Sequence, residues 1–430
     1  MKFSLLFHRW TSVPVAAALL TVVVAVSGCG SSSTNSAASK STPGSASTPA
    51  STSTPSTTST ATKSPLLVGL ETAVGSPVDS HPYTEPSAQA AIRAVNAGGG
   101  LNGHPLKLVF CNDHSSPTMA SACARMFVSD RIIACVGCHS LSDNLTQPIL
   151  AAAHIPMIAE QAVSSQTFNG SNMYLPQGGS IIDYEVAIGY AVHHGGGHLG
   201  VAFADVPAGQ AFEQLTAAIL KAAGGGTFTT KVPIPTSTSD YSSLAALAQS
   251  GGTRQLLMLL DQAQYQPLMQ AIQSSGGSIQ NYYTTELTSQ KDIDGFGPLS
   301  DHLIVGASFP PADSPQMAPF VNDMKTYGGP PINDITLEND ALPWVALQAL
   351  VKVTKGMNTI DGSTIMAALN KAKNIDIGPM LPPWTPSAKG PPYFTRISNP
   401  AIWLKAYKSG QPTLLFDHAI PLSNALAGKF

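Results

Sequence analysis

An alternation of short apolar runs with helical patterns is the feature that most constrains the fold. It begins near residue 65, where PLLVGLE, LKLVFC and RIIACVG have the length and content of buried strands. Between the first two runs, Ala88, Ile92 and Val95 recur at helical spacing. Strands that alternate with helices form a parallel sheet covered by helices on both faces. Because the series starts again near residue 185 with LGVAFAD, we predict an α/β fold of two Rossmann-like lobes with parallel sheets in tandem.

The last third of the chain continues with helices and ends in a predicted hairpin. Helical patterns cover 315–327, 339–354 and 362–373. The stretch AIWLKAYKSGQPTLLF has two strand-like halves, with Ser409 and Gly410 at the turn between them. About 360 residues follow the start of the pattern, which is too many for a single hydrophobic core and agrees with two lobes.

The first 29 residues have the pattern of an export signal. Lys2 and Arg9 accompany 14 largely apolar residues, VPVAAALLTVVVAV, a run shorter than the ~20 residues that a transmembrane helix needs. The segment ends in VSGC, and a small-small-Cys ending resembles that of bacterial lipoprotein signals. We expect a signal peptide over 1–28 and a lipid on Cys29. An ordinary signal peptide with an incidental cysteine is the alternative.

The segment that follows has the composition of a disordered tether. Residues 30–64 are almost entirely Ser, Thr, Ala, Pro and Gly, with two lysines, and such a sequence buries too little apolar surface to fold. Over the whole chain the formal net charge is −3 and charged residues make up 11%. Because no basic run is interleaved with aromatic residues, nucleic acid is not an expected partner.

Two glycine-rich stretches and a histidine group do not predict cofactor or metal binding. GGGLNG (98–103) and GGGHLG (195–200) match the pattern of a dinucleotide loop, but each ends a helix and leads into a strand. A dinucleotide loop needs the reverse order, with the phosphate at a helix N-terminus. His193, His194 and His198 have no acidic or thiol neighbour in the sequence, which favours a solvated loop. We therefore expect no cofactor and no metal site.

The stretch CVGCH, residues 135–139, has the spacing of a c-type haem attachment site. It finishes a predicted strand, and in an open parallel sheet the carboxyl ends of the strands line a ligand crevice. Haem attachment is therefore not expected. Cys138 and His139 could also be proposed as a catalytic pair, but adjacent residues of an extended chain point to opposite faces. We do not predict an enzyme.

Four cysteines follow Cys29, and in an oxidising compartment an even number indicates disulfides. Cys111 ends a strand and Cys123 faces inward from the next helix, so we favour a Cys111–Cys123 pair. Cys135 and Cys138 are ~10 Å apart along an extended strand, beyond the ~7 Å that a disulfide allows. They can pair only if the chain turns after Cys135. Buried or free thiols are the alternative.

From about Pro65 to Phe416 the chain resembles the branched-chain amino-acid-binding family of periplasmic solute receptors, which are type I binding proteins that serve ABC importers. The resemblance is carried by AAIRAVNAGGGLNGHPLKLVFCND, SPTMASACARMFVSDRIIACVGC, TQPILAAAHIPMI and IDIGPM. It implies two lobes joined by three crossings, near residues 178, 307 and 380. The ligand would be held between the lobes and enclosed by hinge closure.

The resemblance also implies a set of ligand-binding residues. Ser140 and Ser142 would bind a ligand carboxylate, and Glu286 would pair with a ligand ammonium, a surface carboxylate being the alternative for Glu286. The family has an Ala-Thr pair where this chain has Ala162 and Val163, so the expected threonine is replaced. Further residues expected in loops at the cleft are Ser164, Asp205, Tyr265 and Asn339. Ala208 stands where the family often has an aromatic residue.

We therefore predict a monomeric, extracytoplasmic receptor, lipid-anchored to the membrane, that captures a small polar ligand and delivers it to the permease of an ABC importer. An amino acid or related amide is the expected ligand. The predicted parts are a signal peptide (1–28), a tether (29–64), lobe 1 (65–178 plus 308–380), lobe 2 (179–307 plus 381–416) and a C-terminal extension (417–430). A ligand sensor for a signalling partner is the first alternative, and an extracytoplasmic enzyme is the second.

Overall fold

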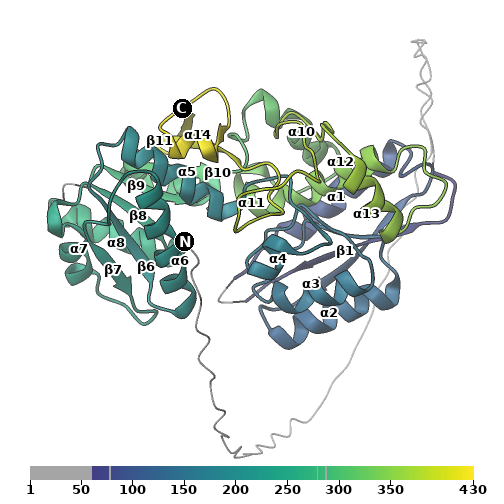
Figure 1. Cartoon of the computed structure of the whole chain (residues 1–430), viewed down its shortest axis with the longest axis horizontal. Helices are drawn as coiled ribbons and strands as arrows, with labels where there is room; N and C mark the ends of the chain where they lie inside the picture. The colour runs from purple at the N-terminus through teal and green to yellow at the C-terminus, as the bar shows by residue number, and fades with distance from the viewer. Residues whose placement is uncertain (1–60, 77–78, 278, 286–287) are drawn as a thin grey trace, which may run out of the picture. The chain divides into compact units, whose positions relative to one another are not determined.

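Two β-sheets, each covered by helices, organise the folded part of the chain (Figure 1). The computed structural model describes residues 61–76, 79–277, 279–285 and 288–430. The predicted signal peptide, Cys29 and most of the predicted tether lie outside this range. Within it, no helix is both long and apolar enough to span a membrane.

The first sheet is fully parallel and has the strand order β2-β1-β3-β4-β5. Its longest pairing joins β1 to β2, from Leu66 opposite Leu106 to Thr72 opposite Asn112. Because β3 lies between β1 and β4, the loops that follow these three strands meet at one edge of the sheet. The strands are β1 (Leu66–Thr72), β2 (Leu106–Asn112), β3 (Ala134–Val136), β4 (Met157–Ile158) and β5 (Met173–Tyr174).

Alternate residues of these strands face two different helix layers. Ala134 and Val136 pack into one hydrophobic cluster, and Cys135 between them packs into another, as the pleat of a strand requires. The first cluster includes residues of α1 (Thr84–Ala97), α10 (Ala318–Thr326), α11 (Leu337–Asp340), α12 (Leu342–Val353) and α13 (Gly362–Lys371). The second includes residues of α2 (Pro117–Asp130), α3 (Asp143–Ala152) and α4 (Ser165–Asn169).

The second sheet has the strand order β12-β11-β10-β9-β8-β6-β7 and combines parallel and antiparallel pairs. Strands β6 to β10 are parallel, whereas β11 runs antiparallel to β10 and to β12. The predicted hairpin is confirmed: Ser409 and Gly410 have φ values of 50° and 77°, as a two-residue type I′ turn needs. The strands are β6 (Leu199–Ala204), β7 (Lys231–Ile234), β8 (Gln255–Leu259), β9 (Asn281–Thr285), β10 (Leu303–Ala307), β11 (Ala401–Lys408) and β12 (Gln411–Leu414).

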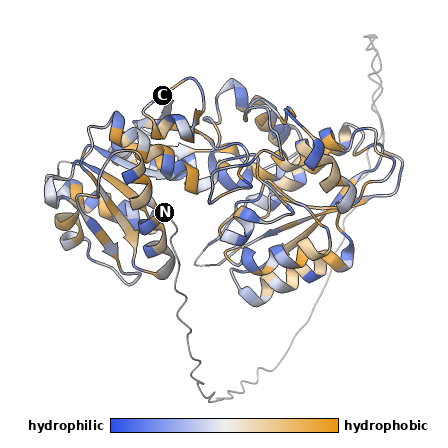
Figure 2. Cartoon of the chain, in the orientation of Figure 1, coloured by the Kyte–Doolittle hydropathy of each residue, from blue (hydrophilic) through white to orange (hydrophobic). Residues whose placement is uncertain are grey.

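Helices also cover both faces of the second sheet. Residues of α5 (Gly179–His193), α6 (Pro207–Ala222) and α14 (Leu422–Leu426) share one cluster with the strands. Residues of α7 (Ser242–Ala248), α8 (Gln262–Ser274) and α9 (Gln290–Phe296) share another. The remaining elements are β13 (Ile420–Pro421), which pairs with β11, and the 3-10 turns η1 (Ser250–Gly252), η2 (Gly297–His302), η3 (Pro315–Met317) and η4 (Ile332–Asp334). Figure 2 shows hydrophobic residues concentrated on the strands between these layers.

The chain passes between the two sheets three times. The first passage joins β5 to α5, and the second follows β10, near residues 178 and 307. The third was predicted near 380, but Leu381 and Trp384 pack in the cluster of α1 and α12, and Trp384 pairs with Ile375. The structure therefore has this passage between Trp384 and the start of β11 at Ala401.

Hydrogen bonds connect these passages at Ser308, the residue directly after β10. Its hydroxyl donates to Glu338 Oε1 of α11 at 2.9 Å and accepts a hydrogen bond from the N–H of Gly179, the first residue of α5, at 3.0 Å. The first and third passages also lie side by side, since Leu175 pairs with Ile397. The segments that join the lobes thus form one connected structure.

The ends of the folded body differ in one respect from the predicted parts. Lys63 donates from its backbone N–H to Gly103, and the carbonyl of Ser64 contacts His104 Nδ1, although both residues were assigned to the tether. These two residues therefore belong to the first lobe. The C-terminal extension packs on the second lobe, where Ile420, Leu422 and Ala425 are buried.

Candidate functional site

The carboxyl ends of β1, β3 and β4 bring together four of the residues predicted to bind a ligand, Ser140, Ser142, Ala162 and Ser164, with other polar side chains. In open parallel sheets this edge is where ligands bind. Asp79 and His81 come from the loop after β1, His139 and Ser140 from the loop after β3, and Ala162 from the loop after β4. The strand order β1-β3-β4 makes these loops neighbours.

A tight turn after β3 sets the direction of the CVGCH segment. Gly137 has φ 63°, a left-handed conformation that favours glycine, and it reverses the chain so that Cys135 and Cys138 form a disulfide with Cα atoms 6.1 Å apart. A Cβ at Gly137 would lie 2.4 Å from the backbone nitrogen of Pro343. Because both cysteines are in the disulfide, neither is available for haem attachment, and Cys138 offers no free thiol for the catalytic pair with His139.

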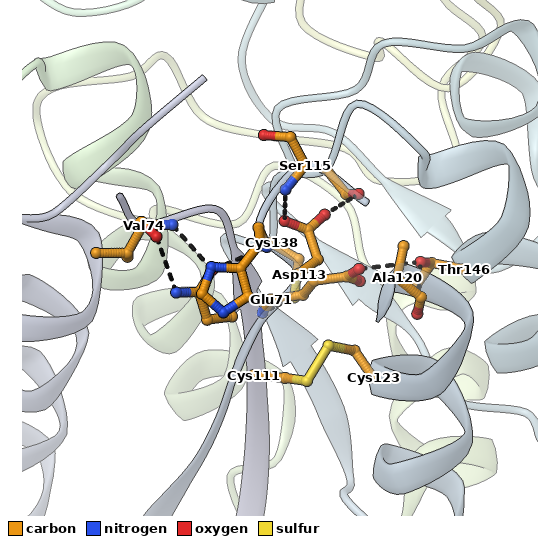
Figure 3. Close-up of a disulfide and its surroundings, with 12 residues drawn as sticks. Glu71, Val74, Cys111, Asp113, Ser115, Ala120, Cys123, Cys138 and Thr146 are labelled. Carbon is orange, nitrogen blue, oxygen red and sulfur yellow. Dashed lines mark hydrogen bonds between the residues drawn. A yellow bond between two sulfur atoms is a disulfide. The ribbon is translucent and has the colours of Figure 1, made fainter. Parts of the chain in front are cut away.

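The disulfide pairing that the sequence favoured is also present. Cys111, in β2, is joined to Cys123 of α2, with Cα atoms 5.6 Å apart (Figure 3). This disulfide lies beside a layer of buried acidic side chains, which includes Glu71, Asp113, Asp143 and Glu160. Burial raises the pKa of Glu71 to about 8, and the charge of Asp113 adds to this effect. The pKa of Glu160 is also raised, first by burial and then by Asp143 and Glu71.

Ser140 and Ser142, predicted to bind a ligand carboxylate, are connected to each other and to this layer. The Ser140 hydroxyl donates to Asp113 Oδ2 at 2.5 Å and accepts from the backbone N–H of Ser142 at 3.1 Å. Both residues are buried. Asp113 also accepts a hydrogen bond from the N–H of Ser115 at 2.9 Å, as Figure 3 shows. The carboxylate of Asp113 therefore fixes the rotamer of Ser140.

A second carboxylate, Asp143 at the start of α3, holds the loop after β4. Its Oδ2 atom accepts hydrogen bonds from the N–H of Val163 at 2.7 Å, the N–H of Ser164 at 3.1 Å and the hydroxyl of Thr167 at 2.7 Å. Ser164 is the N-cap of α4, and its hydroxyl accepts from the N–H of Thr167. The hydroxyl of Ser164 thus has a structural partner, and Ala162 is half-buried beside it.

The other predicted site residues lie further along the chain. Asp205 is exposed after β6 and accepts a hydrogen bond from Gln210 at 3.0 Å. Tyr265 is buried in α8, where its hydroxyl hydrogen bonds to Thr288. Glu286, the predicted partner of a ligand ammonium, lies outside the described residues, as does Leu287. Ala208 lies in α6, and the structure describes its backbone but not its side chain.

Asn339 lies in α11, whose Leu337 packs in the same hydrophobic cluster as residues of α1 and α12. Its side-chain amide lies 3.1 Å from Nδ1 of His81. The structure therefore brings Asn339 to the loops after β1 and β3, together with Ser140 and Ser142.

Asp79 and His81 are the residues that sequence reasoning missed. The Asp79 carboxylate lies between two imidazoles, with Oδ1 2.6 Å from His81 Nε2 and Oδ2 2.9 Å from His139 Nε2. The two rings meet edge to face with centroids 4.8 Å apart. Burial opposes the charge on Asp79, but the hydrogen bonds with His139 and His81 outweigh it and hold its pKa well below the ordinary value. Burial likewise opposes charge on His139, yet Asp79 raises the pKa of that imidazole to about 9.

Comparison with known proteins gives one family and several structures of the same fold. A sequence profile described as periplasmic binding protein matches residues 68–397. No curated protein sequence is a significant match to the chain. Solved structures at 15–17% identity share the fold: a possible leucine/isoleucine/valine-binding protein from Rhodopirellula baltica (16% identity, TM-score 0.67, covering 84% of this chain and 98% of that one), a leucine-binding protein from Thermotoga maritima (15%, 0.65, 84% and 99%), and an ABC transporter substrate-binding protein from Desulfitobacterium hafniense in complex with Leu (17%, 0.64, 82% and 100%).

Proposed function

The chain belongs to the periplasmic binding protein family, and from that premise we propose that it is an extracytoplasmic receptor that captures a small polar solute between its lobes and delivers it to an ABC importer. The single observation that carries this proposal is the polar edge of the first sheet. There, the Ser140 hydroxyl donates a hydrogen bond to the buried Asp113 and the loop after β4 is held by the buried Asp143, at the edge of a parallel sheet where such folds bind ligands. The passages connected through Ser308 support a hinge between the lobes.

An amino acid or a related amide is the ligand class that we propose. Solved relatives include a leucine complex and two proteins named for branched-chain ligands. Glu286 would pair with the ligand ammonium. Ser140 and Ser142 would bind its carboxylate once the Ser140 hydroxyl turns from Asp113 to the ligand. Val163 replaces the expected threonine, and Ala208 replaces an aromatic residue. These changes argue against a standard branched-chain site.

Attachment to the membrane through a lipid on Cys29 is a separate part of the proposal. It is supported by the VSGC ending of the apolar leader and by the Ser/Thr/Pro-rich segment after it. Cys29→Ser should release the exported chain from the membrane fraction, whereas the unchanged chain should stay with the membranes. Equal release of both chains would contradict lipid anchoring.

The ligand proposal is tested by a thermal-shift screen of the Cys29→Ser chain with amino acids, short amides, polyamines and small carboxylates. A ligand at 100 times its Kd adds ~2.7 kcal/mol to the stability of the folded state, which is a measurable rise in Tm. For an amino-acid hit, we expect Glu286→Gln and Ser140→Ala to weaken binding at least ~10-fold by calorimetry, since each removes a charged or hydroxyl partner. Ser165→Ala, at an exposed position of α4, is the matched control and should bind normally.

Two results would contradict the ligand proposal. One is a screen in which no amino acid or amide raises Tm. The other is a hit whose affinity stays the same in both Glu286→Gln and Ser140→Ala, because the ligand would then be bound somewhere else.

A further inference from the structure

Among the residues that the structure describes, one group of three metal-ligating side chains converges. One ligand atom from each of Asp79, His81 and His139 lies within 4.8 Å of the others. We propose that these three residues bind a divalent transition-metal ion, with zinc as the best match, since two imidazoles and one carboxylate are common zinc ligands.

The hydrogen bonds of His139 require either a proton or a metal ion between its other ring nitrogen and Asp79. Nδ1 lies 3.1 Å from the carbonyl oxygen of Gln161, which only accepts hydrogen bonds, so Nδ1 carries a hydrogen. The neutral ring then has a bare lone pair at Nε2, and this lone pair faces Asp79 Oδ2 at 2.9 Å. Two lone pairs in this arrangement repel each other unless a proton or a metal ion lies between them. Metal-binding histidines usually have such an acceptor on the opposite nitrogen.

His81 is oriented in a similar way by Asn339. The Asn339 amide lies 3.1 Å from Nδ1 of His81, and its Oδ1 atom is buried without a partner among the described residues. Turning the amide by 180° satisfies Oδ1, which then accepts the hydrogen of Nδ1. Nε2 of His81 is left with its lone pair directed at Asp79, as in His139.

The spacing of the three side chains suits a small ion. At zinc–ligand distances of ~2.0–2.1 Å, tetrahedral ligands are ~3.4 Å apart. The separations of 2.6 Å from Asp79 Oδ1 to His81 Nε2 and of 2.9 Å from Asp79 Oδ2 to His139 Nε2 need to open by less than ~1 Å to reach this value. Separations within the group that approach its upper bound of 4.8 Å need to close by ~1.4 Å. The side chains are 15%, 12% and 9% exposed, so a fourth ligand can approach from solvent.

The surrounding charges favour a cation at this position. Asp340 lies close enough to His81 for the two side chains to interact electrostatically, and Asp143 interacts electrostatically with His139. Asp113 is adjacent through its hydrogen bond to Ser140. A metal ion that replaces the protons between Asp79 and the imidazoles would be stabilised by these carboxylates.

The other histidine group of the chain has a different environment. His194 stacks on Tyr190 and meets the ring of Phe430, and His193 packs against Gly428. Their contacts are aromatic and structural, and they provide the control for a metal-binding experiment. A chain with His193→Gln and His198→Gln keeps the proposed site intact.

The test is calorimetric titration of the chelator-treated, desalted Cys29→Ser chain with ZnCl2, together with the visible absorption of bound Co²⁺. We expect one equivalent of zinc to bind. Asp79→Asn, which keeps the size of the side chain but removes its charge, and His139→Gln should each weaken zinc binding more than ~100-fold. This loss exceeds the ~10–100-fold expected for Asn339→Ala, which removes an outer partner. The His193→Gln, His198→Gln chain should bind zinc like the unchanged chain, and far-UV circular dichroism should show each variant folded.

Three outcomes would overturn the proposal: no binding of zinc or cobalt, equal affinity in folded Asp79→Asn, or loss of binding in the His193→Gln, His198→Gln control. In each of these cases the cluster is a carboxylate shared by protonated imidazoles. Because the metal alone is the probe, failure here leaves the proposed capture of a solute untouched, and failure of the ligand screen leaves the metal site untouched.

Discussion

Replacing Glu185 with glutamine should make the protein more stable at neutral and alkaline pH. Glu185 lies in the middle of α5, whose residues pack against the second sheet, and its side chain is 5% exposed. Burial, the one cause of the shift, raises the pKa of its carboxyl from 4.5 to about 7. Glutamine has the same shape but stays neutral, so the substitution removes the cost of holding a charge in this place.

The magnitude follows from the difference between the folded and unfolded pKa values. Between pH 4.5 and 7 the folded state keeps a proton on Glu185 that the unfolded state has lost, so stability falls as pH rises through this range. One pKa unit corresponds to 1.36 kcal/mol, and a rise from 4.5 to about 7 therefore amounts to about 3 kcal/mol. The full cost is present above pH 7 and absent below pH 4.5.

Urea denaturation of the two chains at pH 4, 6 and 8 measures this effect. The unfolding free energy of Glu185→Gln should exceed that of the unchanged chain by about 3 kcal/mol at pH 8 and by little at pH 4. Comparing the two chains at each pH isolates Glu185 from Glu71 and Glu160, whose raised pKa values act in the same direction. Glu85→Gln, in the first turn of α1, is the control and should change stability by no more than ~1 kcal/mol. A Glu185→Gln difference that is the same at pH 4 and pH 8 would refute the reasoning.

Two further substitutions test the turn after β3 and the connection at Ser308. Gly137→Ala should lower the unfolding free energy by ~3 kcal/mol or more. The new Cβ would lie 2.4 Å from the backbone nitrogen of Pro343, and this clash adds to the strain of a side chain at positive φ. Gly196 has φ 81° and open space around it, so Gly196→Ala should lower the unfolding free energy by the strain alone, ~1 kcal/mol. Equal losses of stability in Gly137→Ala and Gly196→Ala would contradict the clash with Pro343. Ser308→Ala should lower the unfolding free energy, measured by urea denaturation, by ~1–3 kcal/mol, because it removes a hydrogen bond to the buried Glu338. A change below ~0.5 kcal/mol would show that this bond does not stabilise the connection at Ser308.

The architecture and part of the site could be predicted because local patterns determine them. The spacing of apolar residues predicts strands and helices, and Ser409-Gly410 between two strand-like segments predicts the hairpin turn. The Cys111–Cys123 pair was favoured because a strand end and the inward face of the next helix are neighbours in any αβ unit. These inferences need no knowledge of which strands lie side by side.

The features that were missed depend on contacts between distant segments. Cys135 and Cys138 pair because Gly137 adopts a left-handed conformation, and a Cβ at this position would clash with Pro343, a residue far away in the sequence that no local pattern shows. Asp79 and His81 meet His139 because β1 and β3 are neighbours in the sheet. The DxH spacing in the loop after the first strand was a signal, but it has a meaning only once the strand order is known.

The hydrogen bonds of Asp143 have a consequence for the thermodynamics of ligand capture. Ordering a residue of backbone costs ~1–2 kcal/mol in conformational entropy, and a mobile binding loop would lose this free energy at the moment of association. Here three hydrogen bonds from residues 163–167 to a single carboxylate order the loop when the chain folds. In the proposed receptor, the first lobe would therefore present an ordered half-site. The entropy lost on binding would then come mainly from the ligand and from the closing movement of the second lobe.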